Sequence, residues 1–564
     1  MNRSLQRASV GLIGAFVRTR LGHIQTTYAP SPRLRARSRS TQLKRAVLVL
    51  SVLGAAGIAC NPQPAAWNQG INTIGPVAIG TQVMWVDTSR GRVFTIDPSN
   101  ATPAVGKIVV PRGATDIVTT RNHDRLLLLT PGTPRTRTDQ PAAIPPQLSV
   151  VTPADAANGI PGQHFDLGAP FDHLAISADG NTAIAHFTTD SSVGSQAVFA
   201  NPNELAIIDL HPGAANPVVS RTIRSLGSAP IGVVFSPVIT IGGAPRNLAV
   251  ILATDYATII DLTHPERNEI TVPLQLPSGN ATITPEQVLF DTSAATVYLR
   301  ASGAADVFAL ALTAEQQTDP VKNDFVLHIN QPSTGKTVLD MMLFTDGQKS
   351  YVLTANSTSD LSLIDSATGD FAIIPTAGPV DTLLPIGEPP TEAAVFSRRN
   401  PQATVTFVTL KNIGVGLGSN LSVRTLAKPV HDLVPVPGGS QLVVVHDDAR
   451  TVVSILDLGP QRIDTPILGH LALTSYDFAG DNLIGVATGL NQLGVLALAT
   501  LNPSSIDLEY PPIHVVAVGD HIIVDHAQPG GLATVIPNAT STRADTTVVW
   551  NFLLDGVLDE SLEN

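Results

Sequence analysis

The chain has a single cysteine, Cys60, in 564 residues. One thiol excludes an intramolecular disulfide and any metal site built from several cysteines. Aromatic residues make up 4% of the chain, with three tryptophans, which supplies little material for the aromatic platforms that hold sugars or flat cofactors. We therefore expect no cofactor.

The motifs of common catalytic sites are also missing. The sequence has no G-x-S-x-G elbow, no Walker phosphate loop, no H-E-x-x-H pair and no aspartate-rich EF-hand loop. One glycine-rich stretch, GVGLGSN at residues 414–420, lies between two expected strands. We interpret it as a turn rather than a phosphate loop.

Acidic residues are absent from residues 1–59, which hold ten basic residues. The remainder of the chain has 34 − 10 = 24 basic and 46 acidic residues, a net charge of −22. A body this acidic, without a basic stripe, argues against nucleic acid as a partner.

The composition nevertheless provides a large core. Hydrophobic residues make up 43% of the chain and charged residues 14%, so the chain is not disordered by composition. Glycine and proline number 44 each, which predicts many turns and few long helices.

The single cysteine follows an apolar run. Lys44 and Arg45 precede AVLVLSVLGAAGIA, an uncharged segment of secretory length that is short for a permanent span. The run ends in Gly57-Ile58-Ala59-Cys60, which resembles the lipobox of bacterial lipoproteins. The resemblance implies cleavage before Cys60, a lipid on its thiol and a place in the cell envelope. Asn61 replaces the aspartate that commonly retains such proteins at the inner membrane, so we expect an outer-membrane anchor facing the periplasm or the cell surface.

Two alternatives for the leader stay open. One is an ordinary signal peptide followed by an incidental cysteine. The other is a mitochondrial transit peptide, because residues 1–45 are rich in arginine and serine and lack acidic residues.

The remaining chain repeats a pattern that is clearest at Asp346 to Pro375, where the two apolar runs YVLTA and LSLID are separated by a polar turn. Ten such units align on the end of the second run, with an average spacing of about 49 residues. This period, with several strands and no helix, is typical of propeller blades. The aligned positions are Asp97, Thr152, Asp209, Asp261, Ala311, Asp365, Arg424, Asp457, Ala497 and Ile536.

The clearest unit resembles the YVTN-type, WD-like propeller repeat. Its Asp346-Gly347 turn, Tyr351-Val352-Leu353-Thr354 strand and Leu363-Ile364-Asp365 strand match the order of that motif. The resemblance implies an all-β propeller of four-stranded antiparallel blades. Seven, eight or ten blades are possible from the count. The aspartates at the strand ends are interpreted as turn formers, because their carboxylates can accept backbone N–H groups of the next turn.

We expect a leader and signal peptide at residues 1–59, a tether at 60–71, a propeller at 72–555 and an acidic tail at 556–564. A subdivision near Lys428 is possible, and the seventh unit, with ATVTFVTL and NLSVRTL as its two runs, is irregular. Thr546–Leu554 predicts a terminal strand that closes the ring by completing the first blade. Two inserted loops, Thr130–Pro146 and Thr188–Asn203, are candidate parts of a functional face.

Catalytic candidates are sparse. Asp172 with His173, and His431 with Asp432, form similar pairs near the first strands of two units, and first strands line the channel of a propeller. The densest histidine and carboxylate clusters, which are the candidates for a metal, are His446 with the two aspartates after it and His521, Asp525 and His526. For each, a structural histidine or a loop cap is the competing interpretation.

These observations favour a non-catalytic envelope lipoprotein whose propeller loop face binds a protein or another envelope ligand. A lactonase-like hydrolase that uses the mouth of the central channel is the alternative, because some relatives with this repeat are lactonases. Fold alone does not decide between them.

Overall fold

A computed structural model describes residues 71–554. Its gaps are 72, 101, 133–143, 189–200, 215, 224–228, 277–281, 348, 414–419, 447–451, 460–462, 469–472, 487–489 and 529. Cys60, the leader, most of the tether and the acidic tail lie outside the described residues. Residues 71–556 form one compact unit.

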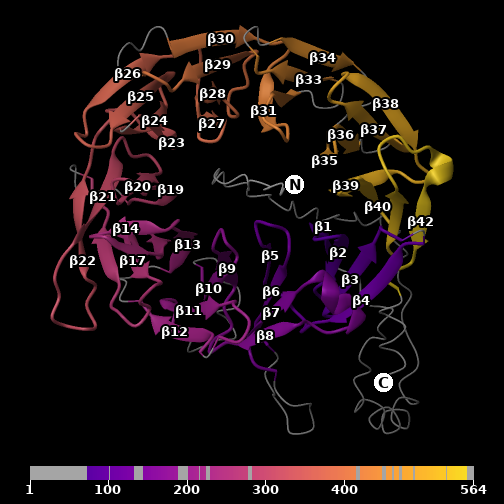
Figure 1. Cartoon of the computed structure of the whole chain (residues 1–564), viewed down its shortest axis with the longest axis horizontal. Coiled ribbons are helices and arrows are strands. Elements are labelled where there is room, and N and C mark those ends of the chain that lie inside the picture. Colours follow the sequence, from indigo (N-terminus) through magenta and orange to yellow (C-terminus); the bar gives the residue numbers. More distant parts are fainter. Residues whose placement is uncertain are drawn as a thin grey trace, which may run out of the picture. The chain divides into compact units, whose positions relative to one another are not determined.

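The described chain folds into ten sheets of four antiparallel strands, arranged as a propeller (Figure 1). All-β architecture with four-stranded blades is confirmed, and the number of blades is ten. Blade 1 contains β1 (Thr73–Ile79), β2 (Gln82–Asp87), β3 (Arg92–Asp97) and β4 (Ala104–Val109). Blade 2 contains β5 (Asp116–Thr119), β6 (Leu126–Thr130), β7 (Gln147–Val151) and β8 (Gln163–Asp166). Blade 3 contains β9 (His173–Ile176), β10 (Thr182–His186), β11 (Glu204–Asp209) and β12 (Val218–Thr222).

Blade 4 carries an extra hairpin, β14 (Ile239–Ile241) and β15 (Ala244–Arg246), between its first two strands. Its four main strands are β13 (Pro230–Phe235), β16 (Leu248–Ala253), β17 (Tyr256–Asp261) and β18 (Ile270–Pro273). Blade 5 contains β19 (Pro285–Asp291), β20 (Thr296–Ala301), β21 (Val307–Ala314) and β22 (Phe325–Asn330). Blade 6 contains β23 (Val338–Asp346), β24 (Lys349–Asn356), β25 (Asp360–Asp365) and β26 (Phe371–Pro375).

The last four blades follow the same plan. Blade 7 contains β27 (Thr382–Ile386), β28 (Glu392–Phe396), β29 (Thr404–Thr409) and β30 (Leu421–Thr425). Blade 8 contains β31 (Val430–Pro435), β32 (Gln441–His446), β33 (Val452–Asp457) and β34 (Asp464–Leu468). Blade 9 contains β35 (Ser475–Ala479), β36 (Asn482–Val486), β37 (Gln492–Ala497) and β38 (Asn502–Asp507). Blade 10 contains β39 (Pro512–Val518), β40 (His521–His526), β41 (Leu532–Ile536) and β42 (Thr547–Trp550). Within the part of the chain that the structure describes, the short 3-10 helices Pro153–Ala157 and Arg543–Asp545 lie between strands.

The middle strands of each blade explain why the repeat is visible in the sequence. In blade 6, seven of the eight residues of β24 are buried, as are the first five of β25, whereas the outer strand β26 is mostly exposed. A strand covered on both faces reads as a continuous apolar run rather than an alternating one. The second and third strands therefore carry the detectable pattern, and the first and fourth do not.

The aspartates that end third strands are turn formers, as predicted. On each, Oδ1 accepts the backbone N–H two residues later, at 2.6–3.0 Å, which organises the turn to the outer strand. They are Asp97, Asp209, Asp261, Asp365 and Asp457.

The alignment of the seventh unit was wrong by one strand. NLSVRT belongs to the outer strand β30, and the run VTFV belongs to the third strand β29. The second strand, β28 (EAAVF), was missed because it is short and begins with a glutamate. With Thr409 as the aligned position, the unit ends 44 residues after Asp365 and 48 before Asp457, so the blade is regular.

Hydrophobic packing joins every blade to the next. Ten clusters of described residues lie at the ten boundaries between blades, and the one between blades 7 and 8 continues the packing across residue 428. The tenth cluster joins blade 10 to blade 1 through Trp85, Phe94, Ile523 and Phe552, so side chains close the ring.

The C-terminal strand contributes to closure in a different way from the one predicted. β42 pairs with β41 and completes the tenth blade, because the first blade already has four strands from its own sequence. The residues after β42 then turn back, and Phe552 and Leu553 enter the cluster shared with blade 1. Phe552 lies 4.9 Å from Trp85 and 6.4 Å from Phe94, measured between ring centroids.

No helix among the described residues is long and apolar enough to span a membrane. Much of both inserted loops, and all but Asn420 of the glycine-rich stretch, lies outside the described residues.

Candidate functional site

Asp172 and His173 are neighbours in sequence but have different partners. Asp172 is 9% exposed and accepts the backbone N–H of Thr188 at 3.0 Å and its hydroxyl at 3.3 Å. His173 begins β9, and its side chain is 52% exposed, with Nδ1 3.5 Å from Oδ2 of Asp116. The carboxylate that faces this imidazole therefore comes from blade 2.

Two residues near His173 were not identified from the sequence. Asp116 lies in β5 and also accepts the backbone N–H of Leu174 at 2.8 Å. His186 ends β10, and its ring stacks on that of His173 with centroids 5.9 Å apart. Burial lowers the pKa of His186, whose Nδ1 lies 3.1 Å from the carbonyl oxygen of Phe187. No sequence signal marks Asp116. His186 could have been found, because it ends the second strand of its blade as His446 and His526 end theirs.

The second pair lies in blade 8. His431 is exposed on β31. Oδ1 of Asp432 accepts hydrogen bonds from Nη2 of Arg398 in blade 7 at 2.6 Å and from Nε of the same residue at 3.2 Å. Asp432 thus ties two blades together. Blades 3 and 8 are five apart in a ring of ten, so β9 and β31 lie on opposite sides of it (Figure 1). The two pairs form separate sites.

Aspartates on the first strands share a structural task. Asp116, Asp340 and Asp477 each accept the N–H of the residue that follows, at 2.8–2.9 Å. Each also accepts, at 2.8 Å, an N–H from the first strand of the next blade. Each side chain thus bonds two backbone donors, one of them in the next blade. These three aspartates therefore tie adjacent blades together.

Two of the histidines proposed as metal ligands are hydrogen-bonded within their own blades and to the loops that precede them. His446 is buried, with Nε2 2.7 Å from Oγ of Ser454 and Nδ1 3.1 Å from the carbonyl oxygen of Lys428. His526 repeats this arrangement, with Thr534 Oγ1 at 2.8 Å and the carbonyl oxygen of Pro511 at 3.1 Å. Both rings link the second and third strands of a blade to a preceding loop. The aspartates after His446 lie outside the described residues.

On β40, successive side chains point to opposite faces of the sheet. His521 and Asp525 share one face and His526 points to the other, so the three do not converge. Among the described residues, no three histidine, cysteine or acidic side chains are grouped so that they could hold a metal ion.

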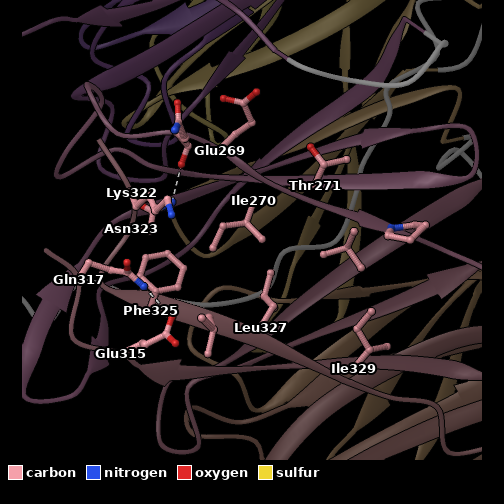
Figure 2. Close-up of a pocket in the computed structure, with 14 residues that line it drawn as sticks. Glu269, Ile270, Thr271, Glu315, Gln317, Lys322, Asn323, Phe325, Leu327 and Ile329 are labelled. Carbon is pink, nitrogen blue, oxygen red and sulfur yellow. Dashed lines mark hydrogen bonds between the residues drawn. The ribbon is translucent and has the colours of Figure 1, made fainter. Parts of the chain in front are cut away.

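A groove lies between blades 4 and 5, with a volume of about 520 Å³. It is lined by the two outer strands, β18 and β22, and by the loop that precedes β22 (Figure 2). Val272 and Phe325 are buried, Ile270 and Leu327 are half-buried, and Ile329 is 46% exposed. Glu315, Gln317, Lys322 and Asn323 form its polar end. Sequence analysis missed this groove because it joins outer strands, which lack the apolar pattern.

Ion pairs hold the two walls of the groove in place. The extra hairpin of blade 4 ends in Arg246, which is buried and pairs with Asp261 at 3.2 Å and with Asp324 of blade 5. Arg221 of blade 3 pairs with Glu269 at 2.5 Å. Gly242 makes the hairpin turn with φ +59°, and a Cβ there would clash with Ala314 of β21. The groove is thus preformed.

No family model matches the chain, and no curated protein matches it significantly. Solved structures similar to it include a dihydro-heme d1 dehydrogenase, NirN, in complex with DHE, at 11% identity and a TM-score of 0.37, covering 64% of this chain and 71% of that one. A eukaryotic initiation factor is similar at 11% identity and a TM-score of 0.39, covering 71% of this chain and 88% of that one. Similarity this distant carries no argument about function.

Proposed function

We propose that the chain is a non-catalytic binding scaffold of the cell envelope, anchored through a lipid on Cys60, with a YVTN-type propeller that binds a protein or envelope ligand. One observation carries the proposal. The acidic and histidine side chains that chemistry would require mostly bind other parts of the ring, while the groove between blades 4 and 5 is open and preformed.

The envelope assignment rests on the leader. Cys60 follows an apolar run at the position where a lipobox requires it, and it is the only cysteine of the chain. The anchor would place the propeller at the outer membrane, facing the periplasm or the cell surface. A membrane-tethered ring needs no further membrane contact to meet partners that share the surface.

A lactonase-like hydrolase is the second candidate, and one observation favours it. The half-exposed His173 imidazole beside the Asp116 carboxylate is the arrangement of a general base with an orienting acid. The contact of 3.5 Å is long for a hydrogen bond, and the same carboxylate already accepts the N–H of Leu174.

Replacing Cys60 with serine is expected to release the protein from the membrane fraction. A hydroxyl cannot form the thioether that carries the lipid, so the serine variant lacks the lipid anchor. Fractionation of cells that produce the wild type and Cys60→Ser, with and without globomycin, measures this. Wild-type protein in the membrane fraction, lost in the variant, supports the anchor; equal distribution of both overturns it.

The hydrolase alternative is tested on purified residues 61–564. Hydrolysis of a simple lactone that disappears in His173→Asn and persists in His431→Asn would replace the scaffold proposal. The scaffold account expects no such hydrolysis in any of the three proteins.

A further inference from the structure

The outer strand β22 has one edge that no other described strand covers, since it is last in its sheet and pairs only with β21. Side chains of β22 and β18 line the groove between blades 4 and 5 (Figure 2), so the groove lies next to the uncovered edges of both strands. An exposed edge of this kind is a template for a further strand.

The phase of the β21–β22 ladder identifies the backbone groups that lie on the uncovered edge of β22. Glu315 donates its N–H to the carbonyl of Asp324 at 2.8 Å, and Val307 donates to Pro332 at 3.0 Å. Hydrogen-bonded pairs alternate along an antiparallel ladder. Residues 326, 328 and 330 therefore bond to β21. The N–H and C=O groups of Phe325, Leu327 and Ile329 point away from it.

Prolines in two other outer strands occupy the outward positions of their own ladders. Proline occurs in sheets where its missing N–H would face away from the ladder. In blade 4, the N–H of Leu274 donates to the carbonyl oxygen of Asp255 at 2.8 Å. With this phase, the backbone groups of Thr271 and Pro273 in β18 point away from β17. Pro375 occupies the corresponding outward position in β26 of blade 6, since Asp365 donates to Asp370 in that ladder.

The side chains that line the groove determine which kind of peptide segment can bind there. Ile270, Leu327 and Ile329 offer apolar surface on both walls. At the polar end, the exposed carboxylate of Glu315 accepts a hydrogen bond from a neutral amide, that of Gln317, at 2.7 Å. A basic side chain would pair with it. The net charge of −22 after the leader also attracts a basic segment.

We propose that β22 takes up an extended apolar and basic segment of a partner protein by strand addition, with the backbone groups of Leu327 and Ile329 forming the new ladder. The inference rests on the proposed function and names its site and partner class. Five residues from Phe325 to Ile329 span about 16 Å at the usual rise per residue, so a segment of about five residues fills the edge. The ion pairs of Arg246 hold the groove open, so binding requires little ordering of this protein.

The test uses a fluorescein-labelled eight-residue peptide of alternating valine and threonine, flanked by lysines, and purified residues 61–564. Saturable binding is expected by fluorescence anisotropy. N-methylation of the alternate backbone nitrogens that would face β22 is expected to weaken binding at least tenfold, since each lost backbone hydrogen bond contributes about that factor. Glutamates in place of the flanking lysines are expected to weaken it as well.

Ile329→Pro removes an outward N–H without removing a β21–β22 hydrogen bond, and is expected to abolish binding. Its matched control is Ile373→Pro in β26, where an isoleucine exposed to 48% also has an outward N–H. Thermal unfolding of both variants checks that each one folds. Binding that survives Ile329→Pro, or that both variants lose equally, overturns the inference.

Other occupants give different outcomes. Self-association that Ile329→Pro abolishes, seen by sedimentation, would assign the edge to a second copy and overturn the inference. Absence of peptide binding, with Cys60-dependent membrane association intact, overturns strand addition and leaves the proposed anchored scaffold standing.

Discussion

Phe552→Ala is expected to open the ring between blades 10 and 1 and to lower stability by about 3–5 kcal/mol, as loss of a buried phenylalanine does. The side chain is 1% exposed and contacts Trp85 and Phe94 across the boundary. No strand of the described chain is shared between these two blades, so side-chain packing closes the ring there. Hydrogen exchange of β2 and β40 measures the opening.

The matched control is Phe407→Ala, which removes an equally buried phenylalanine between blades 7 and 8. There the chain itself connects the two blades. We expect a similar fall in the thermal midpoint for both variants, with faster exchange in β2 and β40 for Phe552→Ala alone. Unchanged exchange in those strands would show that the C-terminal residues do not hold the ring closed.

Asp525→Asn is expected to stabilise the protein at pH 8 by about 2–4 kcal/mol and to have little effect at pH 4. Burial raises the pKa of Asp525 from 3.8 to about 7. His514 lies opposite it on β39, Ala533 on β41, and Trp85 faces it from blade 1. The buried indole Nε1–H of Trp85 lacks a hydrogen bond of ordinary geometry, so it offsets little of the burial.

The direction follows from linkage. A carboxyl with a raised pKa in the fold favours the folded state when it is protonated, and that contribution is lost as pH rises from about 4 to about 7. Asparagine has no charge to bury, so the variant keeps the contribution. Asp520→Asn, an exposed aspartate in the β39–β40 turn, is the control. An equal difference between wild type and Asp525→Asn at both pH values would mean that folding does not raise the pKa of Asp525.

The blade plan was predictable because it is local. The apolar runs of β24 and β25 and the turn at Asp365 lie within one short segment, and each is visible as a residue pattern. The alignment of the seventh unit was wrong because the apolar pattern is weak in its second strand, β28. The route of closure was not predictable, because the destination of Phe552 depends on blade 1, more than 400 residues earlier.

For the candidate sites too, the local residues were predictable and their distant partners were not. His446 and His526 were identified from local clusters, but their roles depend on Ser454, Thr534 and loop carbonyls that only the folded blade brings together. The groove depends on Arg246 and Asp324, which lie 78 residues apart and pair only when a hairpin crosses between blades. The apolar pattern of a sequence indicates which residues of a single strand are buried. It does not indicate a groove between two strands of different blades.

The most direct measurement of the account is site-specific cross-linking in intact cells. A photoreactive benzoylphenylalanine replaces Ile329 in one strain and the equally exposed Ile373 in another. The account predicts a discrete cross-linked adduct with one partner protein from position 329, none from position 373, and loss of the adduct when Cys60→Ser removes the anchor. Adducts of equal yield from both positions, or none from position 329, would contradict a binding scaffold that acts through this groove.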